Sequence, residues 1–172
     1  MLSKKLQSAL NDQINAELFS AYLYLSMSSW FKAQNLEGFA SWLQVQAQEE
    51  VGHAMKIYGY LHNKGIDVEL KQIEAPKKSW KSPLAAFEDT YKHEVYISGR
   101  INDLVDLAVA DKDHATNVLL HWFVGEQVEE EASALAVVEK LKLVATHPGG
   151  IYMLEREMAS RGVAEGGGTE GE

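Results

Sequence analysis

Apolar residues recur at helical spacing over four long stretches of the chain, and this pattern restricts it to an all-α fold. No segment alternates apolar and polar residues as a half-buried strand does, and the helical stretches cover residues 3–31, 37–63, 82–110 and 113–144. Ser3 and Ser82 are suited to cap the first and third stretches, and Pro83 follows at a first helical position. A short fifth helix is predicted over residues 150–160.

The links between these stretches predict how the helices are arranged. Short breaks join the first stretch to the second and the third to the fourth, so each pair forms an antiparallel hairpin. The link over residues 65–81 is much longer. A helix of about 28 residues measures roughly 42 Å, and about 17 extended residues can cover that distance. We therefore expect a four-helix bundle with one long crossover, with residues 1–161 as its domain and 162–172 as a flexible Gly/Glu-rich tail.

A polar residue lies near the middle of the apolar seam on each of the four helices. Steps of seven residues keep one helical face turned toward the bundle partners, and such steps connect apolar positions with Glu17, Glu50, Glu94 and Gln127. Glu17 and Glu50 are 33 positions apart, as are Glu94 and Gln127. The two hairpins therefore look like two copies of one unit related by an approximate twofold axis, and their polar groups should meet at one level of the core.

Several carboxylates buried together are unfavourable unless they hold protons or share a cation. Oxygen ligands with one imidazole suit iron or manganese. Glu50 and His53 leave one helical face at i, i+3 spacing, so they can bind one metal together with Glu17. This set predicts a first metal position.

A second metal position is predicted around Glu94, the bridging Glu50 and Glu130. The fourth-helix element, Gln127 to Glu130, has the spacing of Glu50 to His53 but lacks its imidazole. We expect the second metal to be held more loosely than the first. Carboxylates able to pass it onward are Glu49, Glu126 and Glu129.

Composition excludes several other classes of protein. The chain has no cysteine, which excludes disulfides, thiolate nucleophiles and iron–sulfur clusters. Its net charge of −9 disfavours binding to nucleic acid. The N-terminus lacks the apolar region of a secretory signal, and no apolar run approaches the roughly 20 residues of a membrane span, so a cytoplasmic location is expected. A second apolar stripe predicts a homo-oligomer, and it contains Leu18, Tyr22, Leu25 and Trp42.

Other polar and aromatic positions have two interpretations. Tyr24 lies two turns after Glu17 on the same face, so it is either a neighbour of the metals or an aromatic packing residue. The turn at Asp111, Asp113 and His114 is interpreted as a capped turn in preference to an ion channel between subunits. Most histidines away from the seam are expected at the surface or at an interface, and these are His62, His93, His114, His121 and His147.

The chain resembles the prokaryotic non-haem ferritins from about residue 3 to residue 161. The segments that carry the resemblance are NAELFSAYLYLSMS at 15–28, QEEVGHAMK at 48–56, FEDTYKHEV at 87–95 and WFVGEQVEEE at 122–131. The resemblance implies a five-helix, ferritin-like subunit in a hollow shell, commonly of 24 subunits. It also implies a ferroxidase that oxidises Fe(II) with dioxygen or peroxide and stores a ferric oxide mineral for iron homeostasis.

The resemblance also implies roles for individual residues. It gives Glu17, Glu50 and His53 as ligands of one iron, and Glu50, Glu94 and Gln127 or Glu130 as those of the second. It gives a third, transit site formed by Glu49, Glu126, Glu129 and Glu130, and a tyrosine beside the centre in Tyr24. Glu130 stands where haem-containing relatives have a histidine, and Gly52 stands where they have a methionine, so no haem is expected.

Three competing functions stay open at the level of sequence. A di-iron enzyme that oxidises an organic substrate would need an apolar pocket and a firmly held second iron. A small shell that coats DNA generally places its ligands between subunits. An inert bundle with protonated carboxylates would bind no metal stoichiometrically. The natural oxidant, the iron capacity and the effect of the link at 148–150 on shell geometry are also open.

Overall fold

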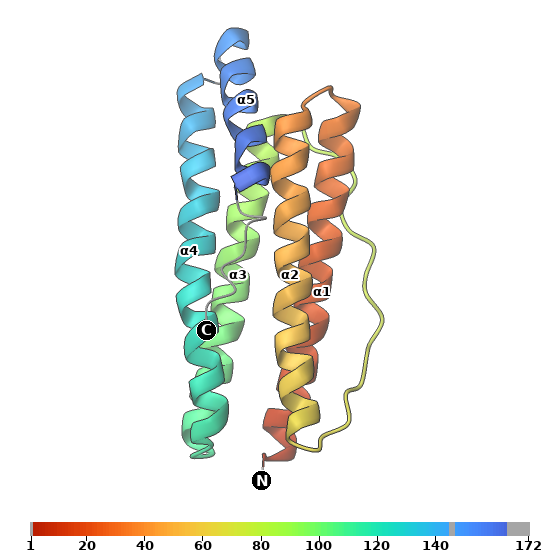
Figure 1. Ribbon diagram of the computed structural model, residues 1–172, viewed down its shortest axis with the longest axis vertical. Helices are drawn as coiled ribbons and strands as arrows, with labels where there is room; N and C mark the ends of the chain where they lie inside the picture. The colour runs from red at the N-terminus through yellow and green to blue at the C-terminus, as the bar shows by residue number, and fades with distance from the viewer. Residues whose placement is uncertain (1, 145–146, 165–172) are drawn as a thin grey trace.

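The computed structural model describes residues 2–144 and 147–164. Its helices are α1 (Lys4–Ala33), α2 (Glu37–Asn63), α3 (Pro83–Ala110), α4 (His114–Val144) and α5 (Pro148–Ala164). As Figure 1 shows, α1–α4 form a bundle of two antiparallel hairpins, and a long crossover joins α2 to α3. The predicted all-α bundle with one crossover and a short fifth helix is confirmed.

Most helix ends lie where the sequence predicts them, because side chains cap them. Ser3 Oγ accepts a hydrogen bond from Leu6 N, and Ser82 Oγ accepts one from Ala85 N, both at 3.1 Å. At the turn before α4, Asp113 Oδ1 accepts from the backbone N–H of Thr116 at 2.9 Å. The interpretation of this region as a capped turn is therefore confirmed.

The two hairpin turns have the same backbone feature at matching positions. Asn35, between α1 and α2, has φ 58°, and Lys112, between α3 and α4, has φ 55°. These residues are 77 positions apart, as are Glu17 and Glu94. Both adopt the left-handed conformation that non-glycine residues visit only singly, mostly in turns. The shared feature agrees with an internal repeat of a two-helix unit.

A polar layer divides the apolar core of the bundle into two clusters. One cluster surrounds packed aromatic rings from three helices and includes Phe31, Phe39 and Phe87. The other lies toward the opposite end of the bundle and includes Leu6, Leu10 and Leu61. The seam carboxylates lie in the interval between the clusters, so apolar packing at both ends holds the polar layer in place.

The crossover between α2 and α3 runs along α1 and is fixed to it by side chains (Figure 1). Asn11 Oδ1 accepts a hydrogen bond from Glu69 N at 2.8 Å, and Asn15 Nδ2 donates to the carbonyls of Lys71 and Gln72. These bonds satisfy backbone groups that have no helical partner. The crossover is therefore a packed part of the subunit.

Helix α5 is longer than predicted and packs against the beginning of α2. It starts at Pro148, because a proline loses no helical hydrogen bond in the first turn. The Glu155 carboxylate accepts from the backbone N–H of Gly38, where α2 has no cap from its own Leu36. A Cβ on Gly38 would lie 1.8 Å from the Glu155 carbonyl oxygen, so only glycine permits this approach. Helix α5 includes residues 162–164 of the predicted tail, and residues 165–172 lie outside the described residues.

Part of the second apolar stripe lies on the surface. Tyr22 and Leu25 of α1 are about half exposed, whereas Leu18 is half-buried. Leu70 of the crossover, which is not part of this stripe, is 65 % exposed. Trp42 differs from the prediction: it is buried, and its ring packs against that of Phe87. Within residues 2–144 and 147–164, no helix has the length and apolar character needed to cross a bilayer.

Candidate metal centre

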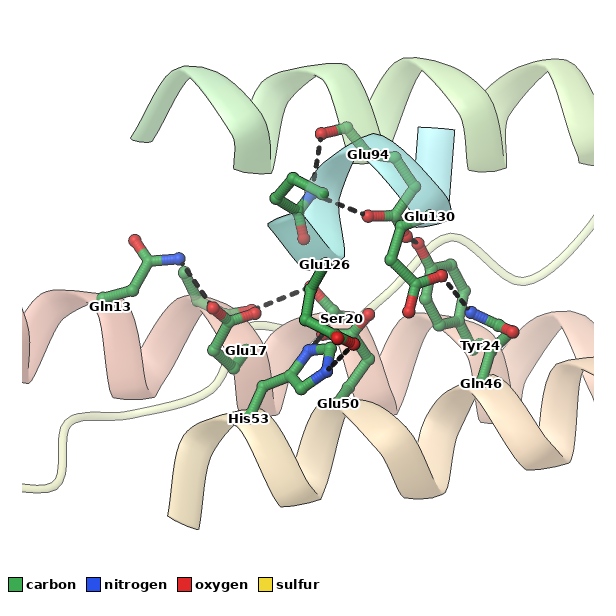
Figure 2. A network of polar contacts seen from close by, with 12 residues as sticks. Gln13, Glu17, Ser20, Tyr24, Gln46, Glu50, His53, Glu94, Glu126 and Glu130 are labelled. Carbon is green, nitrogen blue, oxygen red and sulfur yellow. Dashed lines mark hydrogen bonds and ion pairs between the residues drawn. The ribbon is translucent and has the colours of Figure 1, made fainter. Parts of the chain in front are cut away.

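Side chains from all four bundle helices converge in the polar layer. Figure 2 shows Glu17 of α1, Glu50 and His53 of α2, Glu94 of α3 and Glu130 of α4 pointing into one space. None of these five side chains is more than 8 % exposed. The structure therefore gathers the seam residues that were expected to meet, each near the middle of its helix.

The α1/α2 hairpin supplies one compact group of potential ligands. Ligand atoms of Glu17, Glu50 and His53 all lie within 4.8 Å of one another. Within this group, His53 Nδ1 is 3.5 Å from Glu50 Oε2. The i, i+3 spacing on α2 brings imidazole and carboxylate to one face, and α1 brings the second carboxylate opposite them.

Several polar atoms of this group have no partner within the described residues. Glu17 Oε2, both oxygens of Glu50 and Nδ1 of His53 receive no hydrogen bond. A buried polar atom left in this state costs about 1–3 kcal/mol. All of these atoms are ligand types that iron accepts. Their grouping in one buried space therefore fits a shared metal ion.

Burial also changes the protonation of the carboxylates. Desolvation raises the pKa of Glu17 to about 7, and repulsion from Glu94 contributes to the rise. Desolvation and the charge of Glu17 raise the pKa of Glu50 well above its usual value, and desolvation raises that of Glu94. The cluster therefore holds protons at neutral pH, and a bound cation must displace them.

The imidazole of His53 is neutral and free to act as a ligand. Burial, together with the positive charge of Lys56, lowers its pKa to about 4. Its ring packs edge-on against Trp122 and Phe123, with centroids 5.5 and 6.0 Å away. These contacts fix the ring, and the neutral state leaves a nitrogen lone pair for a metal.

Glu94, the matching carboxylate of the α3/α4 hairpin, is already hydrogen-bonded. The Tyr24 hydroxyl donates to its Oε1, and Gln127 Nε2 donates to its Oε2 at 3.2 Å and to its backbone carbonyl at 3.3 Å. Burial raises the pKa of Tyr24 well above its usual value, so the phenol stays a donor. Among the described residues, Glu94 does not belong to the compact group of Glu17, Glu50 and His53, nor to the second group described next.

A second, overlapping group contains residues from α2 and α4. Ligand atoms of His53, Glu126 and Glu130 lie within 4.8 Å of one another, and His53 Nε2 is 3.8 Å from Glu126 Oε2. Gln46 Nε2 donates to Glu130 at 2.6 Å. Glu126 is half-buried, with a pKa raised by burial and by the nearby Glu129. This group extends from the buried centre toward the exposed side of α4.

The two remaining acidic candidates lie further out. Glu129 is exposed on α4, and Glu49 is half-buried on α2. Neither belongs to the compact groups found in the described residues.

Sequence reasoning missed several neighbours of the centre. Gln13 Nε2 donates to Glu17 Oε1 at 2.9 Å, and its position one helical turn before Glu17 was the only signal available. His93 is half-buried and not at the surface: its Nε2 is 2.8 Å from Ser20 Oγ, and its ring contacts those of Phe19 and Tyr24. The other histidines named with it are exposed.

Comparisons with known proteins agree with this geometry. A family model described as a ferritin-like domain matches residues 7–144. A bacterial non-haem ferritin of Bacteroides fragilis is 42 % identical over 161 residues, covering 94 % of this chain and all of the relative. The Campylobacter jejuni protein of the same description is 43 % identical over 156 residues, covering 91 % and 93 % of the two chains. An open pore ferritin of Archaeoglobus fulgidus superimposes with a TM-score of 0.92 at 50 % identity, covering 92 % and 98 %.

Proposed function

The chain belongs to the ferritin family, among the prokaryotic non-haem ferritins, and from this membership we propose that it oxidises Fe(II) at the buried cluster and stores the ferric product. The observation that carries the proposal is the group of Glu17, Glu50 and His53, whose unpartnered ligand atoms share one buried space. A ferritin fold and an iron-compatible ligand set meet at the same residues.

Iron is the substrate, and it binds first at the α1/α2 group. The neutral His53 provides a nitrogen, and Glu17 and Glu50 provide oxygens once their protons leave. Hard anionic oxygen ligands stabilise Fe(III) relative to Fe(II), which favours electron transfer to dioxygen or peroxide. The group therefore promotes the oxidation that precedes storage.

The second iron is proposed to bind between Glu94, Glu50 and Glu130, with Gln127 beside them. This position has no imidazole, and Glu94 must give up hydrogen bonds from Tyr24 and Gln127 to take part. Both features weaken binding, which suits an ion that leaves after oxidation. A transit site of Glu49, Glu126, Glu129 and Glu130 is proposed beside it, and the grouping of ligand atoms from Glu126, Glu130 and His53 within 4.8 Å supports two of its members.

The subunit is proposed to assemble with copies of itself into a shell, of 24 subunits by analogy with ferritins. Exposed Tyr22, Leu25 and Leu70 support such contacts, because apolar side chains of this size favour burial at an interface. We further propose that storage takes place in the cytoplasm, without haem and without nucleic acid. The relatives named above are described as ferritins and as an open pore ferritin.

The experiment that tests this function adds Fe(II) in air to the purified protein and follows ferric absorbance and particle size. Glu50→Ala and His53→Ala are the matched variants. Fast oxidation by the unchanged protein, slow oxidation by both variants and a large iron-filled particle are expected. Turnover that stops after two irons per chain, with no mineral, would show a di-iron enzyme and refute storage.

A further inference from the structure

The side chain of Gln13 joins the metal centre to the opposite hairpin. It is fully buried on α1, and its Nε2 donates to Glu17 Oε1 at 2.9 Å. Its Oε1 accepts from Arg100 Nε of α3, also at 2.9 Å. A side-chain amide has one donor end and one acceptor end. Both ends are occupied here, so the orientation of the amide is fixed.

Arg100 holds this orientation from the rim of the bundle. It lines a pocket of about 740 Å³ between α1, α3 and the crossover, and its second donor group bonds the Tyr96 hydroxyl at 3.2 Å. If the Gln13 amide turned over, its NH₂ would face the guanidinium and its oxygen would face the Glu17 carboxylate. Donor would then oppose donor and acceptor would oppose acceptor, which disfavours the turned state.

The two oxygens of Glu17 are consequently unequal. Oε1 is bound to Gln13, whereas Oε2 has no partner among the described residues. We propose that Arg100 is a positioning residue for the first iron: acting through Gln13, it orients Glu17 so that Oε2 is presented as the metal ligand. The inference rests on the proposed function, because it assigns a task at the same iron site.

The other hairpin has no equivalent of this arrangement. Thr90 is the residue 77 positions after Gln13 and stands one turn before Glu94. Its hydroxyl bonds the Ala86 carbonyl and contacts Met27 Sδ, and no described bond joins it to Glu94. The orienting contact therefore belongs to the first iron position and not to the bundle in general.

Anaerobic Co(II) titration of the assembled protein, followed by its d–d absorption, tests this inference. The variants are Arg100→Met, which keeps the length of the stem, Gln13→Asn, whose shorter amide cannot reach both partners, and the two combined. Lys71→Met is the control, since Lys71 pairs with Asp12 at the same pocket but has no bond to Gln13. Apo-protein unfolding and particle size are measured for each variant.

Loss of an outer partner of a metal ligand typically weakens metal binding by about 10–100-fold. We expect Arg100→Met and Gln13→Asn each to weaken the first Co(II) at least tenfold and to alter its spectrum. The double variant should be no weaker than Gln13→Asn, and the control and the second Co(II) should change less than twofold. If Arg100→Met does not assemble, Arg100→Lys, which keeps the charge but lacks the Nε–H donor to Gln13, decides the result.

Normal first-site affinity in Arg100→Met, or additive losses in the double variant, would overturn the role of Arg100. If the unchanged protein binds no Co(II) stoichiometrically, the proposed ferroxidase function itself fails. The two failures are therefore distinguishable.

Discussion

The two hairpins of the bundle carry matching residues at the metal centre but hold them differently. In the α1/α2 hairpin, Glu50 and His53 have unpartnered ligand atoms beside Glu17. In the α3/α4 hairpin, Glu94 is bound by Tyr24 and Gln127. One half is prepared for a metal, whereas the other must break hydrogen bonds before it can bind one.

This difference supports the proposal that one centre both captures and releases iron. A site with an imidazole and several ligand atoms that form no hydrogen bond binds more tightly, even though the protons on its carboxylates must first leave. A site whose carboxylate already has donors binds weakly, since the ion competes with them. For the proposed iron oxidation and release, the difference in binding strength between the two halves therefore matters as much as the presence of either ligand set.

The largest effect is expected from removing the imidazole that distinguishes the α1/α2 half. His53→Ala deletes a direct ligand, so its cost should exceed the roughly 10–100-fold typical of outer partners. We expect the first metal affinity and the initial oxidation rate to fall by more than about a hundredfold. The exposed His121→Ala on α4 is the control, and loss of activity there would contradict a local role for His53.

A second prediction concerns the pH dependence of the apo-protein. Glu17 has a folded pKa of about 7 and an ordinary value of 4.5, so it stabilises the fold below pH 4.5 and loses that contribution as pH rises through 7. Glu17→Gln removes this loss. The difference in unfolding free energy, variant minus unchanged protein, should rise by about 3 kcal/mol between pH 4.5 and a pH above 7.

Denaturant unfolding with a chelator present measures this gain. Glu94→Gln is the comparison from the other half, and its gain should be smaller because Tyr24 and Gln127 donate to the ionised carboxylate. A gain for Glu17→Gln that is independent of pH would contradict the burial argument.

The difference between the halves can also be removed by design. Gln127→Glu combined with Glu130→His gives the α3/α4 half the same Glu-x-x-His spacing as Glu50 and His53. We expect the second Co(II) to bind about tenfold tighter, because an imidazole suits these metals. Iron oxidation should then slow after the first two ions per chain. Unchanged turnover beside tighter binding would refute the link between loose binding and release.

The smallest effect is expected from Tyr24→Phe. This change removes one donor to Glu94 but leaves the apolar packing of the ring. The second Co(II) should bind more tightly, by about tenfold or less, because one donor no longer competes with it, and the first should be unaffected. Weaker binding of both ions in the titration would show instead that Tyr24 supports the whole centre.

Sequence predicted the parts of the molecule that depend on local pattern. Helix ends followed from capping residues such as Ser82, and the inward direction of Glu17 and Glu50 followed from steps of seven along a helix. These features depend on residues close in sequence. Both the bundle and its central polar layer could therefore be predicted from the sequence.

The residues that sequence missed depend on contacts between distant segments. Arg100 of the α3/α4 hairpin donates a hydrogen bond to Gln13 of the α1/α2 hairpin, and Glu155 of α5 accepts one from Gly38 of α2. His93 lies one position before the candidate ligand Glu94, yet its contact with Ser20 depends on how closely α1 and α3 pack. The spacing of residues along the sequence does not show which distant residue a long side chain contacts. These supporting contacts could therefore be identified only from the structure.

The crossover has a consequence for symmetry. If the two hairpins were separate identical chains, every substitution would change both metal positions at once, and a centre with one strong and one weak site could not arise in a symmetric dimer. Residues 64–82 join the hairpins into one polypeptide and bind along α1. A mutation can therefore alter Glu130 and leave His53 unchanged, so a single chain can maintain the two unequal metal positions proposed above.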